Sequence, residues 1–179
     1  MNEGKVIELR FLRRGGTQTD RLVVSHLVIA GWTGRDKDAM ERHICELEDL
    51  GVPRPATTPM FYRVSGSRVT TSHCIQVCGP HSSGEVEIVI VSLNGEKWVG
   101  VGSDHTDREL EKHGVTASKQ ICDKPVASTF WSLSDVEERW DLLRLRSYVV
   151  GKKGRELYQD GTVALLLTPQ DLINRFSAE

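Results

Sequence analysis

The sequence predicts a single β-rich α+β domain with helices at its periphery. Short segments alternate apolar and polar residues, which is the pattern of half-buried strands. Residues 60–101 contain almost only strand and turn patterns, and apolar residues at helical spacing are confined to segments near residues 36–50, 134–143 and 168–176. A chain of 179 residues is long enough for one domain with a proper core and too short for two full ones. We therefore expect residues 1–179 to form one domain.

The N-terminal part predicts two strands, a helix and a connector. Residues 6–12 and 22–30 are strand-like, and Arg13-Arg14-Gly15-Gly16 supplies turn residues between them. Residues 36–50 carry apolar side chains at helical spacing, and Gly51-Val52-Pro53 ends that helix. The apolar positions of this helix are Met40, Ile44, Leu47 and Leu50. Residues 53–59 are proline-rich and predict a surface connector.

Three local signals place later elements. Asn94-Gly95 predicts a tight hairpin between residues 88–91 and 97–101. Ser134-x-x-Glu137 matches a capping box and predicts a short helix. Thr168-Pro169 predicts the N-cap and first-turn proline of a last helix. The expected buried positions are Val136, Trp140 and Leu143 in the first of these helices, and Leu172, Ile173 and Phe176 in the second.

Composition and charge argue against several classes of partner. The chain has 23 basic and 25 acidic residues, a formal charge of −2, so no basic surplus indicates nucleic acid. Residues 22–30 are the longest apolar run, which Ser25 and His26 interrupt and which is too short to cross a bilayer. No charged-then-apolar leader opens the sequence, and its four cysteines lack C-x-x-C spacing. We expect a cytoplasmic protein with reduced thiols and with neither nucleic-acid nor membrane partners.

The segment from Gly84 to Val91 holds the pattern most typical of a chemical site. Glu85 and Glu87 are two residues apart on an expected strand, so both side chains point to the same face. Two unpaired carboxylates at that distance repel each other, and a divalent cation held by carboxylate oxygens relieves the repulsion. Asp104 is a plausible third oxygen ligand. The alternative is that both glutamates simply lie on the solvent face of a half-exposed strand.

Five segments in order resemble the fumarylacetoacetate hydrolase superfamily. They are Pro59-Met60-Phe61-Tyr62-Arg63, Glu85-Val86-Glu87, Ser103-Asp104-His105-Thr106-Asp107-Arg108-Glu109-Leu110, Ser118-Lys119 and Tyr158-Gln159-Asp160-Gly161-Thr162. Ser103 and Asp107 depart from the superfamily's usual Asn and Ala. The superfamily's closing Thr-Gly-Thr-Pro segment is not found after Phe176, so we expect a single domain of this type without that segment.

The resemblance implies a mixed β-roll of the superfamily's C-terminal-domain type, with a metal at its mouth. It implies Glu85, Glu87 and Asp104 as ligands of Mg²⁺ (or Mn²⁺ or Ca²⁺). The implied activity is a metal-dependent hydrolase, C–C lyase or decarboxylase acting on a 2-oxo acid or 1,3-dicarbonyl such as an acylpyruvate, in a homodimer. The metal would polarise the carbonyl oxygens and stabilise the enolate as the bond breaks.

Three basic residues match superfamily positions near that metal. Lys119 is expected to stabilise a developing enolate, and Arg63 and Arg108 are expected to bind the substrate or orient a carboxylate. Each also has a purely structural reading. Lys119 fits a solvated surface lysine, Arg63 an edge-strand charge and Arg108 a surface ion pair.

His43 and Glu46 are candidates for a catalytic base. They are three residues apart on the expected helix and so lie on one face of it. A histidine held by a carboxylate is suited to activating water near neutral pH, and His43-Ile44-Cys45-Glu46 resembles a His-x-x-Glu pair of the superfamily. The alternative is an exposed pair without a catalytic role.

Two further readings stay open. His73, Cys74, Cys78 and His81 suggest a zinc cluster, although adjacent residues of a strand face opposite sides and the Cys spacing is atypical, which favours buried cysteine packing. His105 adjoins Asp104 and is either a turn residue or a hydrogen-bond partner behind the site. At the level of function, the alternative to an enzyme is a non-catalytic relic or binding protein that keeps the fold and the metal site.

Overall fold

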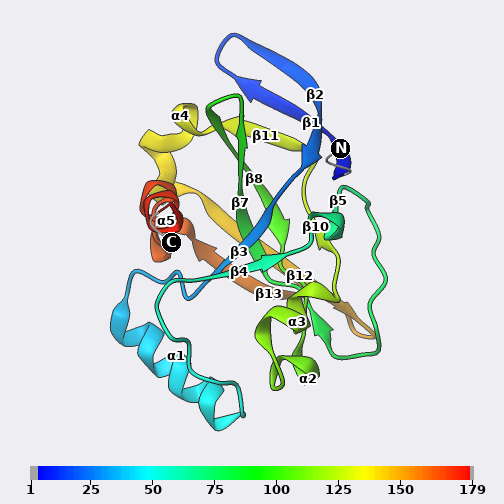
Figure 1. Cartoon of the computed structure of the whole chain (residues 1–179), viewed down its shortest axis with the longest axis vertical. Coiled ribbons are helices and arrows are strands. Elements are labelled where there is room, and N and C mark those ends of the chain that lie inside the picture. Colours follow the sequence, from blue (N-terminus) through cyan, green and yellow to red (C-terminus); the bar gives the residue numbers. More distant parts are fainter. Residues whose placement is uncertain (1–3, 178–179) are drawn as a thin grey trace.

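A five-stranded sheet forms the centre of the computed structural model, which describes residues 4–177 (Figure 1). The strand order is β2-β1-β11-β8-β7. The bounds are β1 Lys5–Arg13, β2 Gly16–Val24, β7 Val86–Leu93, β8 Glu96–Ser103 and β11 Thr129–Ser132. β1 pairs in parallel with β11 and the other neighbours are antiparallel. The α+β class with strands in the majority is as the sequence predicts.

Alternation along the strands builds the core. Ile7, Leu9 and Phe11 are buried on one face of β1, where they pack with Trp98 and Phe130. On β7, Val89 and Val91 pack against this same cluster. Ile88, on the other face of β7, packs against a second cluster of Val99, Trp140 and Val163. The face of β7 that carries Glu87 is therefore the face that borders the main core.

The expected strand over residues 22–30 is wrong as a single element. The chain leaves β2 at Ser25-His26 and continues as β3 (Leu27–Gly31), which pairs with β4 (Met60–Val64). The reason is a change of partner: β2 pairs with β1, but β3 crosses in front of the sheet in Figure 1. Apolar patterning continues through this bend because both strands border the same core.

Short strands and helices surround the open end of the β7–β8 hairpin, where Val86 pairs with Ser103, opposite the Asn94-Gly95 turn; this open end is called the hairpin end below. They are η1 (Gly66–Arg68), β5 (Val69–Thr70), β6 (Ser82–Ser83), β9 (Thr106–Asp107), α2 (Arg108–Glu111), α3 (Val115–Gln120) and β10 (Lys124–Pro125). β5 pairs with β10 and β6 with β9, which brings α2 and α3 beside the hairpin end (Figure 1).

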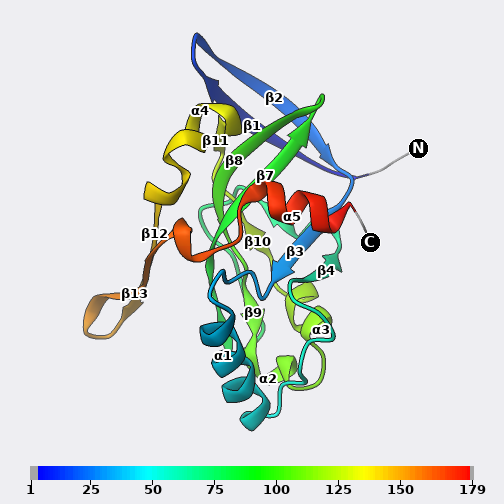
Figure 2. The same ribbon diagram turned by 90° about the vertical axis from the view of Figure 1, so that its left-hand side faces the viewer.

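The C-terminal part adds a hairpin that the sequence did not predict. α4 (Leu133–Val136) and η2 (Glu137–Leu142) lead into β12 (Arg144–Gly151) and β13 (Gly154–Thr162). Figure 2 shows the β12–β13 hairpin projecting from the body of the molecule. η3 (Val163–Leu165) and α5 (Pro169–Phe176) follow.

Most local signals are confirmed. α1 (Lys37–Asp49) begins after the N-cap Asp36, and Gly51 ends it with a φ of 89°. Asn94 and Gly95 form the predicted turn with φ values of 51° and 81°. The Thr168 hydroxyl accepts a hydrogen bond of 3.1 Å from the Asp171 amide at the start of α5.

Three details of the helix predictions are wrong. α4 begins at Leu133, so Ser134 lies inside the helix and is not its N-cap. Leu50 is 65% exposed because α1 ends just before it. Phe176 is 48% exposed and contacts the Phe61 ring at a centroid distance of 5.3 Å, at the surface end of α5. Among the described helices, none is long and apolar enough to cross a membrane.

Candidate functional site

The three acidic residues lie together at the open end of the β7–β8 hairpin. The register pairs Glu87 with Gly102, and the Asp104 amide donates a 2.9 Å hydrogen bond to the Glu85 carbonyl. Asp104 is therefore directly across from Glu85, and Glu87 follows two residues later on the same face. The three carboxylates therefore lie on one face of the hairpin end, and the negative charges of Glu85 and Asp104 act on Glu87. Their convergence on one cation stays a prediction.

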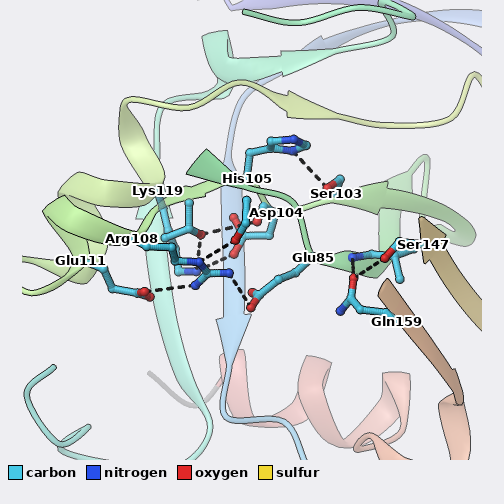
Figure 3. Close-up of polar contacts among 12 residues, drawn as sticks. Glu85, Ser103, Asp104, His105, Arg108, Glu111, Lys119, Ser147 and Gln159 are labelled. Carbon is cyan, nitrogen blue, oxygen red and sulfur yellow. Dashed lines mark hydrogen bonds and ion pairs between the residues drawn. The ribbon is translucent and has the colours of Figure 1, made fainter. Parts of the chain in front are cut away.

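Asp104 is buried between two lysines. Its Oδ2 lies 2.5 Å from Lys119 Nζ, and its Oδ1 lies 2.9 Å from Lys124 Nζ. All three side chains are buried, and Lys119 Nζ also donates a 3.3 Å hydrogen bond to the Thr106 hydroxyl. Figure 3 shows Lys119 beside Asp104. Within residues 4–177, Asp104 Oδ1 accepts no well-directed hydrogen bond, although it forms an ion pair with Lys124. Burial lowers the pKa of Lys124, and the negative charge of Asp104 opposes that shift.

Arg108 holds Glu85 on the other side of the cluster. Its Nη2 donates a 2.7 Å hydrogen bond to Glu85 Oε1, its Nε donates to the Ser83 hydroxyl at 2.7 Å, and its Nη1 donates to Glu111 Oε2 at 3.1 Å (Figure 3). Burial lowers the pKa of Arg108, but Glu85 and Glu111 together raise it above its usual value. The N-cap Asp107 fixes the start of α2 by accepting hydrogen bonds from the Glu109 and Leu110 amides. The guanidinium is thus held in place from three directions.

Glu87 differs from the other two carboxylates. Within residues 4–177 it forms no ion pair, whereas Glu85 and Asp104 are both paired with basic side chains. Burial, and then the charges of Glu85 and Asp104, raise the pKa of Glu87 to about 8, with Lys119 opposing the shift. Near neutral pH this carboxyl therefore holds a proton in the absence of an added cation.

An aromatic chain connects the cluster to α1. Lys119 Nζ lies 5.8 Å from the centre of the Tyr62 ring, and the Trp32 indole donates a 3.2 Å hydrogen bond to the Tyr62 hydroxyl. The Trp32 ring lies 5.9 Å from the His43 ring, and Trp32 has an unusual φ of 60° for a non-glycine residue. His43 Nδ1 lies 3.4 Å from Glu46 Oε2, with 60% and 73% of the two side chains exposed. The expected pair therefore forms, but two aromatic rings separate it from Lys119.

Arg63 and His105 are two residues considered in the sequence analysis whose side chains do not form ion pairs with the three carboxylates in the described residues. Arg63 is exposed and, by alternation along β4, is on the face opposite Tyr62, so the structure does not gather it with the carboxylates. The His105 side chain contacts the Ser103 hydroxyl at 3.1 Å, and its backbone carbonyl accepts a hydrogen bond from Lys124. Burial, followed by the charge of Lys124, lowers the pKa of His105.

Sequence reasoning missed three contributors to the site. Lys124 lies in a short strand after a polar loop, which gives no local signal of burial. Tyr62 and Gln159 lie in segments that resemble the superfamily, but neither was predicted to belong to the site; beside Tyr62, only Arg63 was predicted to do so. Gln159 Oε1 accepts a 2.8 Å hydrogen bond from the Val86 amide and another from the Ser147 hydroxyl, which ties β13 to the start of β7 (Figure 3).

The cysteine interpretation is wrong in its details. His73 and Cys74 lie in a loop between β5 and β6, not on a strand, and both Cys74 and Cys78 are exposed. Buried packing applies to Cys122 alone among the four free cysteines. In the described part of the chain, no three or more His, Cys, Asp or Glu side chains are arranged as an assembled metal site. For Glu85 and Asp104, the reason is that arginine and lysine side chains already engage their oxygens.

Comparisons with known proteins place the chain in a family. A family model described as "Protein of unknown function (DUF2848)" matches residues 30–179. No curated protein matches the chain. A solved structure described as "Crystal structures of Cg1458" is similar with a TM-score of 0.61 at 16% sequence identity, covering 86% of this chain and 58% of that one. At this identity the likeness concerns the fold alone, and this chain spans little more than half the length of that protein.

Proposed function

We propose that this chain, which belongs to the DUF2848 family of proteins of unknown function, is a divalent-metal-dependent hydrolase or C–C lyase. Its proposed substrate is a 2-oxo acid or a 1,3-dicarbonyl such as an acylpyruvate. The observation that carries the proposal is the meeting of Glu85, Glu87 and Asp104 on one face of a hairpin end, beside buried cations. The same segments carry the resemblance to the fumarylacetoacetate hydrolase superfamily. We also propose that this chain has the β-roll fold of that superfamily's C-terminal domain.

The residues present fit a hard divalent cation. All three candidate ligands are carboxylates, which suit Mg²⁺, Mn²⁺ or Ca²⁺. Glu87 lacks an ion-pair partner in residues 4–177 and has a raised pKa, which makes it the carboxylate most open to a cation. Glu85 and Asp104 would bind the ion only by releasing one of their basic partners, Arg108 for Glu85 and Lys119 or Lys124 for Asp104. A cation would take the place of the proton on Glu87. When bound, it would supply Lewis-acid polarisation of the substrate oxygens.

The surrounding basic residues have separate proposed roles. Lys119 and Lys124 bring two buried ammonium groups to one carboxylate, so the site has positive charge available for a substrate carboxylate or a developing enolate. Arg108 keeps Glu85 oriented through its contacts with Ser83 and Glu111. We propose Arg108 and Arg63 as substrate-binding residues; Arg63 lies on the exposed face of β4 and would meet the substrate from outside the cluster.

His43 and Glu46 remain the proposed base for water. Their side chains are in contact on α1, and the Trp32–Tyr62 pair connects that helix to Lys119. Because both side chains are exposed, this role requires α1 to approach the cluster when substrate is bound. We also propose a cytoplasmic location, which fits four cysteines that are all free of disulfides. The proposed homodimer is argued in the Discussion from the exposed side chains of the β12–β13 hairpin.

One observation favours a second function. Glu85 and Asp104 are already neutralised by Arg108, Lys119 and Lys124, so the cluster is electrostatically satisfied without a metal. A binding protein that has kept the fold and the site without turning over a substrate would show this arrangement.

A substrate screen with metal titration tests the proposal. The protein is assayed with Mg²⁺ or Mn²⁺ against acylpyruvates and oxaloacetate, and metal affinity is measured separately by calorimetry. Turnover that EDTA abolishes, and that Glu87→Ala removes together with metal binding, supports the enzyme. Metal binding without turnover supports the binding protein. If the protein neither binds the metal nor turns over a substrate, the metal site itself is contradicted.

A further inference from the structure

A cavity of about 620 Å³ adjoins the carboxylate cluster. Glu87, Asp104 and Lys124 line it at one end of β7, and Ser92 lines it at the other. At about 3.3 Å per strand residue, this stretch of β7 is roughly 16 Å long. The remaining lining is mostly apolar and comes from β7 itself and from other elements that include β1, β3, β11 and α5; examples are Leu9, Ile29, Val89, Phe130, Leu172 and Ile173.

We infer that the substrate carries an apolar acyl chain of several carbons, which lies along β7 in this cavity while its oxo-acid end lies among Glu87, Asp104 and Lys124. This inference rests on the function proposed above and names its substrate class. The volume is within the range of small-molecule sites, and an apolar wall with a few polar groups at one end is their usual composition.

A short oxo acid would leave most of this wall uncovered. The acidic groups Glu87 and Asp104 line only the open end of the hairpin, and Lys97, whose Nζ donates a hydrogen bond to the Ser92 hydroxyl, lines the opposite end. Ile29, Leu172 and Ile173 contribute apolar surface to the same cavity. Each methylene moved from water onto such a wall should tighten binding about threefold to fourfold. We therefore expect affinity to rise with the length of the acyl chain.

Calorimetric titration with two series of ligands tests the inference. The first series is 2,4-dioxo acids from 2,4-dioxopentanoate to 2,4-dioxododecanoate with Mg²⁺, and the second is straight-chain carboxylates from butanoate to dodecanoate without metal. In both, we expect Kd to fall about threefold to fourfold per methylene until the cavity is filled. Turnover of the first series is recorded in parallel.

Variants that fill the cavity test whether the acyl chain of the ligand binds there. Ile173→Trp places a large ring in the cavity from α5, and Ala30→Leu does so from β3 with a smaller change. Leu142→Trp is the matched control because Leu142 is 78% exposed and does not line the cavity. In the first two variants we expect Kd to stop falling at a shorter acyl chain than in the wild type. In the control we expect Kd to fall with acyl-chain length as in the wild type.

The outcomes separate this inference from the proposed function. Length-dependent binding without turnover keeps the cavity assignment and removes the enzyme. Turnover of short dioxo acids with a Kd that is flat across both series overturns the cavity assignment and keeps the enzyme. A length dependence that survives both Ile173→Trp and Ala30→Leu also overturns the assignment, because the chain would then bind elsewhere.

Discussion

Asp104 is the residue on which the charge balance of the site depends. Its carboxylate faces Lys119 and Lys124, all three side chains being buried. Asp104→Asn would leave two buried ammonium groups without a counter-charge. Removing one partner of a buried ion pair typically costs about 3–5 kcal/mol of the free energy of unfolding. We expect a loss of this size in urea unfolding of the metal-free protein.

An exposed aspartate provides the control for that measurement. Asp141 pairs with Arg35 at the surface, where Asp141→Asn should change the free energy of unfolding very little. If both variants were destabilised equally, Asp104 would not be acting as a buried counter-charge.

Glu87 makes the stability of the metal-free protein depend on pH. Its pKa rises from the usual value of 4.5 to about 8 on folding, chiefly through burial, so the folded state binds the proton more tightly than the unfolded state. The stabilising effect of that proton is fully present below pH 4.5 and is lost as the pH rises through about 8. Thermal unfolding should therefore show a Tm contribution that falls over this window and that Glu87→Gln removes.

Metal binding should show the opposite dependence on pH. A cation competes with the proton on Glu87, so Mg²⁺ affinity in calorimetry should rise as the pH approaches 8. Equal pH slopes of Tm in the wild type and in Glu87→Gln would show that another group titrates in this range.

At the scale of elements, α1 decides whether the His43–Glu46 pair is functional. A base for water need not be a metal ligand, so His43→Ala should abolish turnover while leaving metal affinity nearly unchanged. Glu87→Ala should instead lose metal and activity together. Steady-state kinetics and calorimetry on both variants make the comparison. Full activity of His43→Ala would leave α1 as an amphipathic cover with an exposed surface pair.

Elements with local chemical signals could be predicted from the sequence, and elements set by distant partners could not. Asp36, Asn94-Gly95 and Thr168 act through their own backbone neighbours, so their residue types suffice. The break at Ser25-His26 depends on β4 pairing with β3, some thirty residues away along the chain. The β12–β13 hairpin was missed because much of it is exposed and its strands lack clean alternation.

At the scale of the whole molecule, the same division applies to the site. Strand alternation was enough to predict that Glu85 and Glu87 share a face, and the β7–β8 pairing places Asp104 across from Glu85. Lys124 reaches Asp104 because β10 pairs with β5. This is a tertiary contact, which the spacing of residues in the sequence does not predict. Local geometry thus placed only Glu85 and Glu87 on one face, whereas Asp104 and Lys119 were brought to the site chiefly by resemblance, and Lys124 was not predicted.

The projecting β12–β13 hairpin bears on the expected homodimer (Figure 2). Its exposed side chains include Tyr148, Val149, Val150, Leu157 and Tyr158. A two-stranded hairpin is marginally stable by itself, and five large exposed apolar side chains on one hairpin favour an interaction site there. A second copy of the chain would cover this surface and stabilise the hairpin at the same time.

We therefore expect light scattering to give a dimer in the micromolar range, and Val150→Lys combined with Leu157→Lys to give a monomer. The two lysines would place charges in an interface that must be desolvated, whereas in the monomer both positions are already exposed and the fold should keep its circular dichroism spectrum. Leu142→Lys, at an exposed apolar position outside the hairpin, should remain dimeric. A wild-type protein that is monomeric at high concentration would refute the dimer. A double variant that stays dimeric would move the interface away from this hairpin, and the apolar residues of β12 and β13 would then need another partner.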